Sequence, residues 1–259
     1  MTRIVQKPVN ACALATEIEP HAVAAWPARE TQPLDGWLLR FTNGFTHRGN
    51  SVATLQFSGA DVEAAIDTVE SEYRKRRLPP MFQVADAVAP ANLADTLSAR
   101  GYDAITPTFV RMATPSEMRA RLPEPTDVTE ARQPNAEFAA LVAEGSRSEA
   151  DAAERMEILA RVRAELACVI AWADGKVVAC GTATLTNDHV GINMMRTTLA
   201  QRRRGHAQRV LAAIARWAQD KGAARVYLGV EQANAPAIAL YARAGFVPAY
   251  SYRYFRKEL

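Results

Sequence analysis

Apolar residues follow two different spacings in the second half of the chain. Runs rich in β-branched residues predict strands, whereas apolar residues three and four positions apart predict helices. The predicted strands cover 127–131, 167–173, 176–185, 189–198, 225–230 and 249–256, and the predicted helices cover 135–163 with a break near Gly145, 206–222 and 236–244. Asp174-Gly175 is a typical hairpin turn. A hairpin followed by strand, helix, strand, helix and strand predicts an α+β fold with one parallel crossover.

The first half repeats this order more faintly. It has predicted strands at 37–41, 51–57 and 81–85, predicted helices at 61–77 and 91–99, and a turn at Asn43-Gly44. The segment LSARGY at 97–102 matches YARAGF at 241–246 with an offset of 144 residues, and at this offset 83–86 correspond to 227–230. The shared order of elements favours a duplication, and two unrelated domains are the alternative.

A proline-rich stretch separates the two halves. Pro115, Pro123 and Pro125, with charged residues between them, predict a linker over 113–126. The linker divides the 259 residues into a first domain at 1–112 and a second at 127–259. Each part has the size of an ordinary domain.

The most informative stretch is TTLAQRRRGHAQRVL at 197–211, which joins a predicted strand to a predicted helix. Small residues at Gly205 and Ala207 allow the backbone to approach a ligand closely. Successive N–H groups and the positive end of the helix dipole suit a pyrophosphate, to which nearby arginines can add charge-assisted bonds. A solvated basic helix start is the alternative. The stretch is neither a Walker A loop nor GxGxxG.

A second segment, EQANAPAIALYARAGF at 231–246, supplies two chemically suitable side chains. Asn234 can bridge a ligand amide and a neighbouring backbone group. Tyr241 carries an O–H with an ordinary pKa of about 10, which can protonate a departing thiolate with a pKa of about 8.5. Packing on the helix is the alternative role for this tyrosine.

Together these segments resemble the GCN5-related N-acetyltransferase (GNAT) superfamily. The acetyl-CoA signature [Q/R]-x-x-G-x-[G/A] is matched by Arg202, Gly205 and Ala207, and the later family segment by Asn234, Ala237, Leu240, Tyr241, Gly245 and Phe246. Leu199 departs from the proline usual at that position. The resemblance covers about 125–259 and extends to 1–112 through the repeat. It implies tandem GNAT-like domains, each a mixed, mostly antiparallel twisted sheet flanked by helices.

The resemblance also implies acetyl-CoA as cosubstrate and no metal. The implied cofactor-binding residues are Met195, Arg196, Thr197, Arg202, Arg203, Arg204, Gly205, His206, Ala207, Gln208, Asn234 and Tyr241. Backbone groups at 195–197 would hold the pantetheine arm and orient the thioester carbonyl, and amides at 203–208 would hold the pyrophosphate. Asn234 would contact the pantetheine or the strand that splays after Val230. Tyr241 would be the acid for the thiolate.

The acceptor amine must lose a proton, so a base or a water chain is needed. Tyr227, Gly229 and Glu231 share one face of a predicted strand, which makes Glu231 the first candidate for the base. Binding backbone N–H groups at a helix start is its alternative role. His189 and Asn193 are weaker candidates. The motifs place no Cys or Ser beside a base, so direct attack is favoured over an acyl-enzyme.

The first domain lacks the corresponding chemistry. Leu97 stands at the position of Tyr241, and Asp61 in the loop 58–61 would repel phosphate. We therefore predict a degenerate copy that shapes the acceptor cleft or forms a homodimer contact. The whole chain is predicted to be an N-acetyltransferase acting on a primary amine of unknown identity. A non-catalytic acyl-CoA-binding regulatory module and a transferase of a longer acyl group are the alternatives.

Composition restricts the partners and the compartment. Three widely spaced cysteines without CxxC argue against a disulfide framework or a zinc site and favour the cytoplasm. The net charge of +3 argues against a nucleic-acid partner, and 74–77 is interpreted as a solvated helix end. The apolar run at 167–173 is too short to cross a membrane. Cys180 is expected to be buried.

Tyrosines alternate along the last predicted strand. Tyr250, Tyr252 and Tyr254 are two positions apart, so they are expected to face one way. We interpret them as a packed sheet face. The alternative is a row of aromatic side chains that borders an acceptor pocket.

Overall fold

The computed structural model describes residues 11–54, 56–85 and 90–259. The helices are α1 (Ala11–Ala24), α2 (Val62–Lys75), α3 (Leu93–Ala99), α4 (Pro115–Arg121), α5 (Ala136–Glu144), α6 (Glu149–Arg161), α7 (His206–Asp220) and α8 (Ala235–Arg243), with 3₁₀ turns η1 (Arg48–Asn50) and η2 (Leu199–Gln201). The strands are β1 (Glu30–Leu34), β2 (Trp37–Phe41), β3 (Val52–Ala53), β4 (Met81–Ala85), β5 (Asp103–Ala113), β6 (Val128–Ala131), β7 (Glu165–Ala173), β8 (Lys176–Thr186), β9 (His189–Thr197), β10 (Arg225–Glu231) and β11 (Val247–Arg256).

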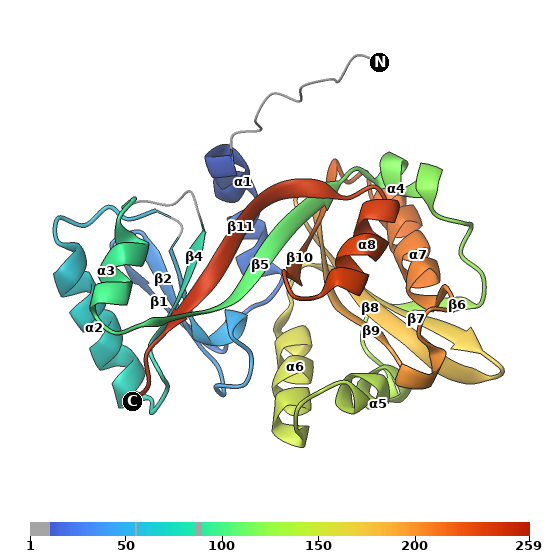
Figure 1. Ribbon diagram of the computed structural model, residues 1–259. Helices are drawn as coiled ribbons and strands as arrows, with labels where there is room; N and C mark the ends of the chain where they lie inside the picture. Colours follow the sequence, from blue (N-terminus) through green and yellow to red (C-terminus); the bar gives the residue numbers. More distant parts are fainter. Residues whose placement is uncertain (1–10, 55, 86–89) are drawn as a thin grey trace, which may run out of the picture.

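These strands form one sheet in the order β1-β2-β3-β4-β11-β5-β10-β9-β8-β7-β6. Its pairs are antiparallel apart from β3 with β4 and β9 with β10. Helices α2 and α3 lie on one half of the molecule and α5 to α8 on the other, with β5 and β11 running between them (Figure 1). The predicted α+β class and the mixed, mostly antiparallel sheets are therefore confirmed.

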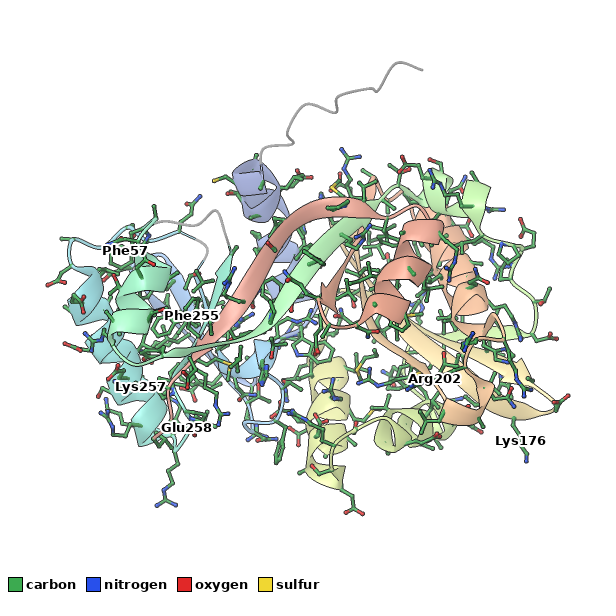
Figure 2. The ribbon with its side chains drawn as sticks, in the orientation of Figure 1. Phe57, Lys176, Arg202, Phe255, Lys257 and Glu258 are labelled. Carbon is green, nitrogen blue, oxygen red and sulfur yellow. The ribbon has the colours of Figure 1, made fainter. Side chains whose placement is uncertain are left out.

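Strands β5 and β11 are exchanged between the two halves. Strand β10 of the second half pairs with β5, and β4 of the first half pairs with β11. Phe255 of β11 consequently belongs to the core of the first half, where it packs with residues such as Phe82. Figure 2 shows Phe255 in the half opposite to Arg202. The two predicted domains share one continuous sheet.

The register between β5 and β11 has an internal two-fold symmetry. Asp103 pairs with Arg256, and Met112 pairs with Val247. With the offset of 144 residues, position 103 corresponds to 247 and position 112 to 256. The repeat therefore converts each of these pairs into the other. Thr108 pairs with Tyr252, and Tyr252 is also the residue that corresponds to Thr108 in the repeat. A duplicated chain with exchanged last strands produces this symmetry.

The stretch 113–126, for which a linker is predicted, contains helix α4. Thr114 and Glu117 form a reciprocal capping box at its start, which stabilises a short helix. Met118 of α4 is fully buried in the core of the second half. Pro115 therefore begins a packed helix, and Pro123 and Pro125 follow it. The stretch is not a flexible connection.

The pattern predicted most elements of the second half and, besides α4, missed one helix and two strands. Helix α1 has Pro20 in its interior, where proline ordinarily ends a helix. Strand β1 contains Pro33 and lies at the edge of the sheet, where proline is tolerated. Strand β5 is long and was not predicted. Leu55 in the predicted strand 51–57 and Asp86 in the repeat lie outside the described residues, and β3 covers only two residues of that strand.

The core of the second half is built on α7, as its apolar spacing predicts. The buried side chains include Val210, Leu211, Ile214 and Ala218, which face β7 and β8. Cys180 is fully buried, as expected, and burial raises the pKa of its thiol to about 12. Within the described ranges, no helix has both the length and the apolar character needed to span a bilayer.

Candidate active site

A groove of about 1070 Å³ runs beside the start of α7, between the end of β9, α8 and the end of α5. Its lining includes the predicted cofactor-binding residues Met195, Arg196, Thr197, Arg202, Arg203, Gly205, His206, Ala207, Gln208, Asn234 and Tyr241. Arg204 is exposed and does not line the groove. The two motifs thus meet in one cleft, although they are separated in the sequence.

The loop before α7 has the geometry of an anion site. Arg203 and Gly205 both adopt left-handed conformations, with φ of 65° and 85°. Gly205 is the N-cap of α7 and supplies no side-chain acceptor to the first turn. Residues 205–208 at this helix start line the groove, so the positive end of the helix dipole lies beside it. This arrangement fits a pyrophosphate such as that of acetyl-CoA.

Strand β9 contains a bulge next to the groove. Its register with β8 shifts between Cys180, which pairs with Arg196, and Thr182, which pairs with Asn193. Met194 within the bulge has a φ of 58°, a conformation that non-glycine residues seldom adopt. The bulge redirects the backbone at 195–197, where backbone groups are expected to orient a thioester.

Strands β9 and β10 separate beside this bulge. Their parallel pairing ends at Ile192 with Leu228, two residues before the predicted point of separation at Val230. Beyond it β10 pairs only with β5, as far as Glu231 and Thr108. The divergence opens the sheet next to the bulge, so a ligand can reach both strands.

A second cavity, of about 470 Å³, lies between the two halves of the chain. The first half contributes Thr46, His47, Arg48, Thr106 and Thr108 to its lining. Seven residues line both this cavity and the groove: Gly145, Arg147, Met195, Arg196, Asn234, Ala237 and Tyr241. The two spaces therefore adjoin at these residues. We refer to the smaller space as the acceptor cavity.

Tyr241 projects from α8 to the junction of groove and cavity. Its ring packs edge-on against Phe246, with centroids 5.9 Å apart. Burial raises the pKa of Tyr241 to about 12, although the charge of Arg196 opposes this rise. The phenol is therefore protonated at neutral pH, as a general acid must be before it acts.

Glu231 and Asn234 occupy the end of β10 and the start of α8. Glu231 is exposed and lines the acceptor cavity, and its carboxylate has no hydrogen bond or ion pair to any residue that the structure describes. The Asn234 side chain accepts a hydrogen bond from the Ala237 N–H at 3.2 Å and caps α8. The alternative role for Glu231, binding N–H groups at this helix start, is filled by Asn234.

The weaker candidates for the base have other partners. His189 bonds to Glu17 at 2.9 Å and to Asp188 at 2.8 Å, and it does not line the acceptor cavity. Asn193 lines the cavity, where its side-chain oxygen accepts a bond from Arg48 at 2.9 Å. Neither arrangement leaves a free base facing the junction.

The tyrosine row of β11 divides between the two proposed roles. Tyr252 and Tyr254 are buried and line the acceptor cavity. Tyr250 donates its O–H to Glu19 at 2.6 Å within the core. The row is thus a packed face that also borders a pocket.

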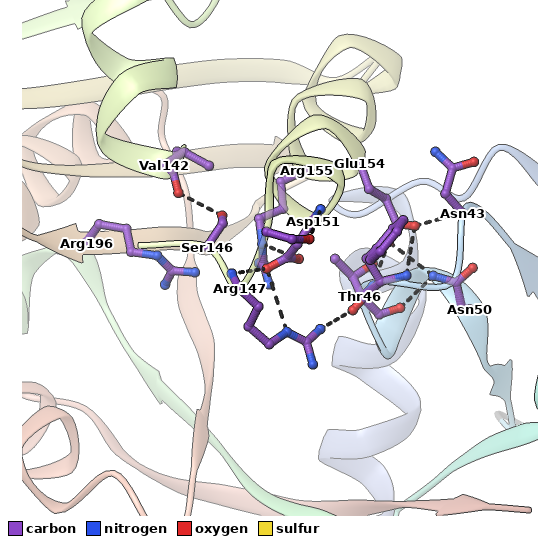
Figure 3. A network of polar contacts seen from close by, with 12 residues as sticks. Asn43, Thr46, Asn50, Val142, Ser146, Arg147, Asp151, Glu154, Arg155 and Arg196 are labelled. Atoms are coloured by element: carbon purple, nitrogen blue, oxygen red, sulfur yellow. Dashed lines mark hydrogen bonds and ion pairs between the residues drawn. The ribbon is translucent and has the colours of Figure 1, made fainter. Parts of the chain in front are cut away.

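The corner between α5 and α6 adds a charged wall to the cavity (Figure 3). Asp151 is almost fully buried and accepts bonds from the Arg147 N–H and from Arg155 Nε, both at 3.0 Å. Burial opposes ionisation of Asp151, but the Arg147 N–H bond and the Arg155 charge lower its pKa. Sequence analysis missed these residues. Ser148 three positions before Asp151 indicates a helix start, but it carries no information about a site.

A buried carboxylate on the same helix holds the first half against this corner. Glu154 is fully buried and accepts bonds from the N–H groups of Asn43, Phe45 and Thr46, and from the side chains of Thr46 and Asn50. These residues belong to the loop 43–50, which brings His47 and Arg48 to the acceptor cavity. Figure 3 shows Glu154 between α6 and this loop.

A bulged and diverging sheet, an anion-binding helix start and an adjoining buried tyrosine define an acetyltransferase of the GNAT superfamily. The sequence resemblance to that superfamily is confirmed. The chain belongs to the family described as "Probable histone acetyltransferase Rv0428c C-terminal", whose model matches residues 15–255.

Individual relatives agree with this assignment. The chain is 27% identical over 246 residues to "Uncharacterized N-acetyltransferase YobR" of Bacillus subtilis, covering 92% of this chain and 96% of that protein. A GCN5-related N-acetyltransferase from Kribbella flavida superimposes with a TM-score of 0.70 at 17% identity, covering 97% and 96% of the two chains. A tandem GNAT protein from the clavulanic acid biosynthesis pathway gives 0.64 at 14% identity, covering 96% and 93%. The protein is an acetyltransferase with a tandem GNAT fold.

Proposed function

We propose that this enzyme transfers the acetyl group of acetyl-CoA to a primary amine by direct attack. The observation that carries the proposal is the meeting of two spaces at Tyr241 and the β9 bulge. One space lies at the start of α7, which suits an anion, and its volume of about 1070 Å³ suits a nucleotide-bearing cosubstrate. The other is lined by residues of both halves and suits an acceptor.

The proposal assigns a group of the protein to each step. Glu231, free at the mouth of the acceptor cavity, takes a proton from the amine as the nitrogen attacks the thioester carbonyl. The new N–C bond forms, the C–S bond breaks, and Tyr241 donates its proton to the departing thiolate. Backbone N–H groups at 195–197 hold the carbonyl oxygen as negative charge develops on it.

The first half is proposed to shape the acceptor cavity without binding a second acetyl-CoA. Asp61 caps α2 by accepting bonds from the N–H groups of Glu63 and Ala64, so a carboxylate occupies the helix start where a phosphate would bind. Leu97, at the position of Tyr241, is fully buried in the core. Thr46, His47 and Arg48 from this half line the cavity instead. The cysteine usage favours action in the cytoplasm.

A CoA-release assay over a library of primary amines tests the proposal. With any active acceptor, Tyr241→Phe should lower kcat by about 10²- to 10⁴-fold, because it keeps the ring and removes the acid. Acetyl-CoA affinity should change little, since one hydrogen bond is worth about 1 kcal/mol. Tyr102→Phe in the first half is the matched control and should leave kcat unchanged.

Three results would contradict parts of this proposal. Binding of acetyl-CoA without release of CoA for any amine would favour the regulatory module. Faster release from longer acyl-CoA thioesters would favour the transferase of a longer acyl group. A kcat within about threefold of wild type in Tyr241→Phe, with chemistry limiting the rate, would leave Tyr241 as a packing residue.

A further inference from the structure

The acceptor cavity carries more positive than negative charge. Four arginines line it: Arg48, Arg147, Arg155 and Arg196. The carboxylates in its lining are Asp151 and Glu231. Arg48 is engaged with Asn193 and with the ring of Trp26, 5.0 Å from its guanidinium carbon. The remaining three arginines gather near the corner between α5 and α6, where Asp151 is the buried carboxylate.

These three arginines repel one another. Burial lowers the pKa of Arg155; Asp151 opposes this effect, and the charges of Arg196 and Arg147 add to it. Burial likewise lowers the pKa of His47, and Arg147, Arg256 and Arg155 lower it further. His47 is therefore neutral at pH 7 and responds to the same positive field. The single negative charge of Asp151 does not balance the positive charges of the three arginines.

Arg196 leaves donor capacity unused at the junction of the two spaces. Its Nε is buried without a hydrogen-bond partner among the described residues, while its Nη1 donates to its own neighbour, Met195 O, at 3.2 Å. The side chain passes directly over Gly145, where an added Cβ would lie 2.8 Å from Arg196 Cδ. A buried guanidinium N–H without an acceptor is costly, and an anionic ligand would satisfy it.

We propose that the acceptor carries an anionic group, a carboxylate or a phosphate, in addition to its amine, and that Arg155 and Arg196 hold this group. The inference rests on the proposed function, because it specifies the acceptor of that same site. The amine then faces Glu231 and Tyr241, which line the same cavity. A cavity of about 470 Å³ has the size of a small-molecule site. A lysine-rich peptide of the kind found in histone tails would meet repulsion here.

The test compares acceptors that differ only in this group. Initial rates are measured for a set of α- and ω-amino acids, each paired with its carboxamide, together with phosphoethanolamine and a lysine-rich histone-tail peptide. Wild type should favour the anionic member of the best pair by at least tenfold in kcat/KM, which corresponds to one charge-assisted hydrogen bond. Whichever anionic amine has the higher kcat/KM, the carboxylate or the phosphate, identifies the anionic group of the acceptor.

The variants show whether the arginines cause this preference. Arg155→Gln and Arg196→Gln should each lower the preference for the anionic acceptor over its carboxamide, measured as the ratio of the two kcat/KM values, by about tenfold. Arg155→Lys should retain part of the preference. Arg216→Gln is the control, because Arg216 is a half-exposed residue of α7 paired with Glu130 outside the cavity.

A thermal-shift measurement with CoA present gives a readout that does not need turnover. Anionic amines should raise the melting temperature of wild type and not of Arg155→Gln. Equal or better use of carboxamides or of the histone-tail peptide, an unchanged preference in both variants, or no shift with any anionic amine would overturn the inference. If no amine releases CoA, the proposed function fails, and the thermal shift still decides whether the cavity binds an anionic amine.

Discussion

Replacing Glu154 tests how the two halves of the chain are held at the acceptor cavity. Its carboxylate accepts bonds at 2.7 Å from Asn43 N, 3.1 Å from Phe45 N and 2.6 Å from Thr46 N. It also accepts bonds at 2.5 Å from Thr46 Oγ1 and at 3.1 Å from Asn50 Nδ2. Glu154→Ala removes the single acceptor that these five donors share, of which the donors of Thr46 and Asn50 are buried.

The expected loss of stability is large. Removing one partner from a buried, charged network costs about 3 to 5 kcal/mol, and each unsatisfied donor alone can cost about 1 to 3 kcal/mol. Since a domain is stable by about 5 to 15 kcal/mol, the loss would shift the urea midpoint strongly. The loop 43–50 carries His47 and Arg48, so KM for the acceptor should rise at least tenfold while the thermal shift by acetyl-CoA stays unchanged.

Urea unfolding with an unchanged m-value measures this loss. Glu157→Gln is the matched control, because Glu157 lies one turn further along α6, is half-exposed and pairs with Arg29 and Arg161. Such pairs contribute about 0 to 1 kcal/mol. The glutamine keeps a side-chain oxygen for the 3.3 Å bond from Asn43 Nδ2. A loss below about 1 kcal/mol in Glu154→Ala, or an acetyl-CoA response that changes as much as KM, would refute the reasoning.

Three further predictions concern binding and pH. Acetyl-CoA should stabilise the wild type by about 2.7 kcal/mol at a hundredfold excess over Kd. Gly205→Glu should abolish this stabilisation, because it adds bulk and negative charge at a residue with a φ of 85°. An unchanged thermal shift in the variant would place the ligand elsewhere. Calorimetric titration should give one acetyl-CoA per chain, since Asp61 occupies the equivalent helix start, and two would contradict a degenerate first half. Burial and nearby arginines lower the pKa of His47 below its ordinary 6.5, so the unfolded chain binds a proton at this residue more readily than the folded chain. The free energy of unfolding should therefore fall as the pH drops below about 6.5. His47→Gln should weaken this pH dependence in urea titrations, and an unchanged pH dependence would contradict the prediction.

The cosubstrate side of the site could be predicted because its chemistry is local. Gly205 and the arginines before it lie within one strand-to-helix connection, and Tyr241 lies in one short segment with Asn234. Each signal depends on spacing along a few residues, which sequence shows directly. The groove that brings Met195 and Tyr241 together is the arrangement that these signals require.

The acceptor side could not be predicted in the same way. Arg48, Arg155 and Arg196 reach one cavity from η1, α6 and β9, so their proximity depends on tertiary packing. Glu231 was chosen as the candidate base from strand periodicity, and its free carboxylate is visible only in the structure. Strand β5 escaped prediction although its pairing with β11 joins the two halves.

The exchange of β5 and β11 has a consequence for how the chain folds during synthesis. Strand β11 follows every other strand in the sequence, yet β4 pairs with it and Phe255 fills the core of the first half. The first half therefore cannot complete its sheet when its own residues leave the ribosome, because one edge of β4 has no partner strand until β11 is made. Multidomain chains usually fold one domain after another, but here both halves reach their final state together. A premature stop before residue 252 would thus destabilise the half made first.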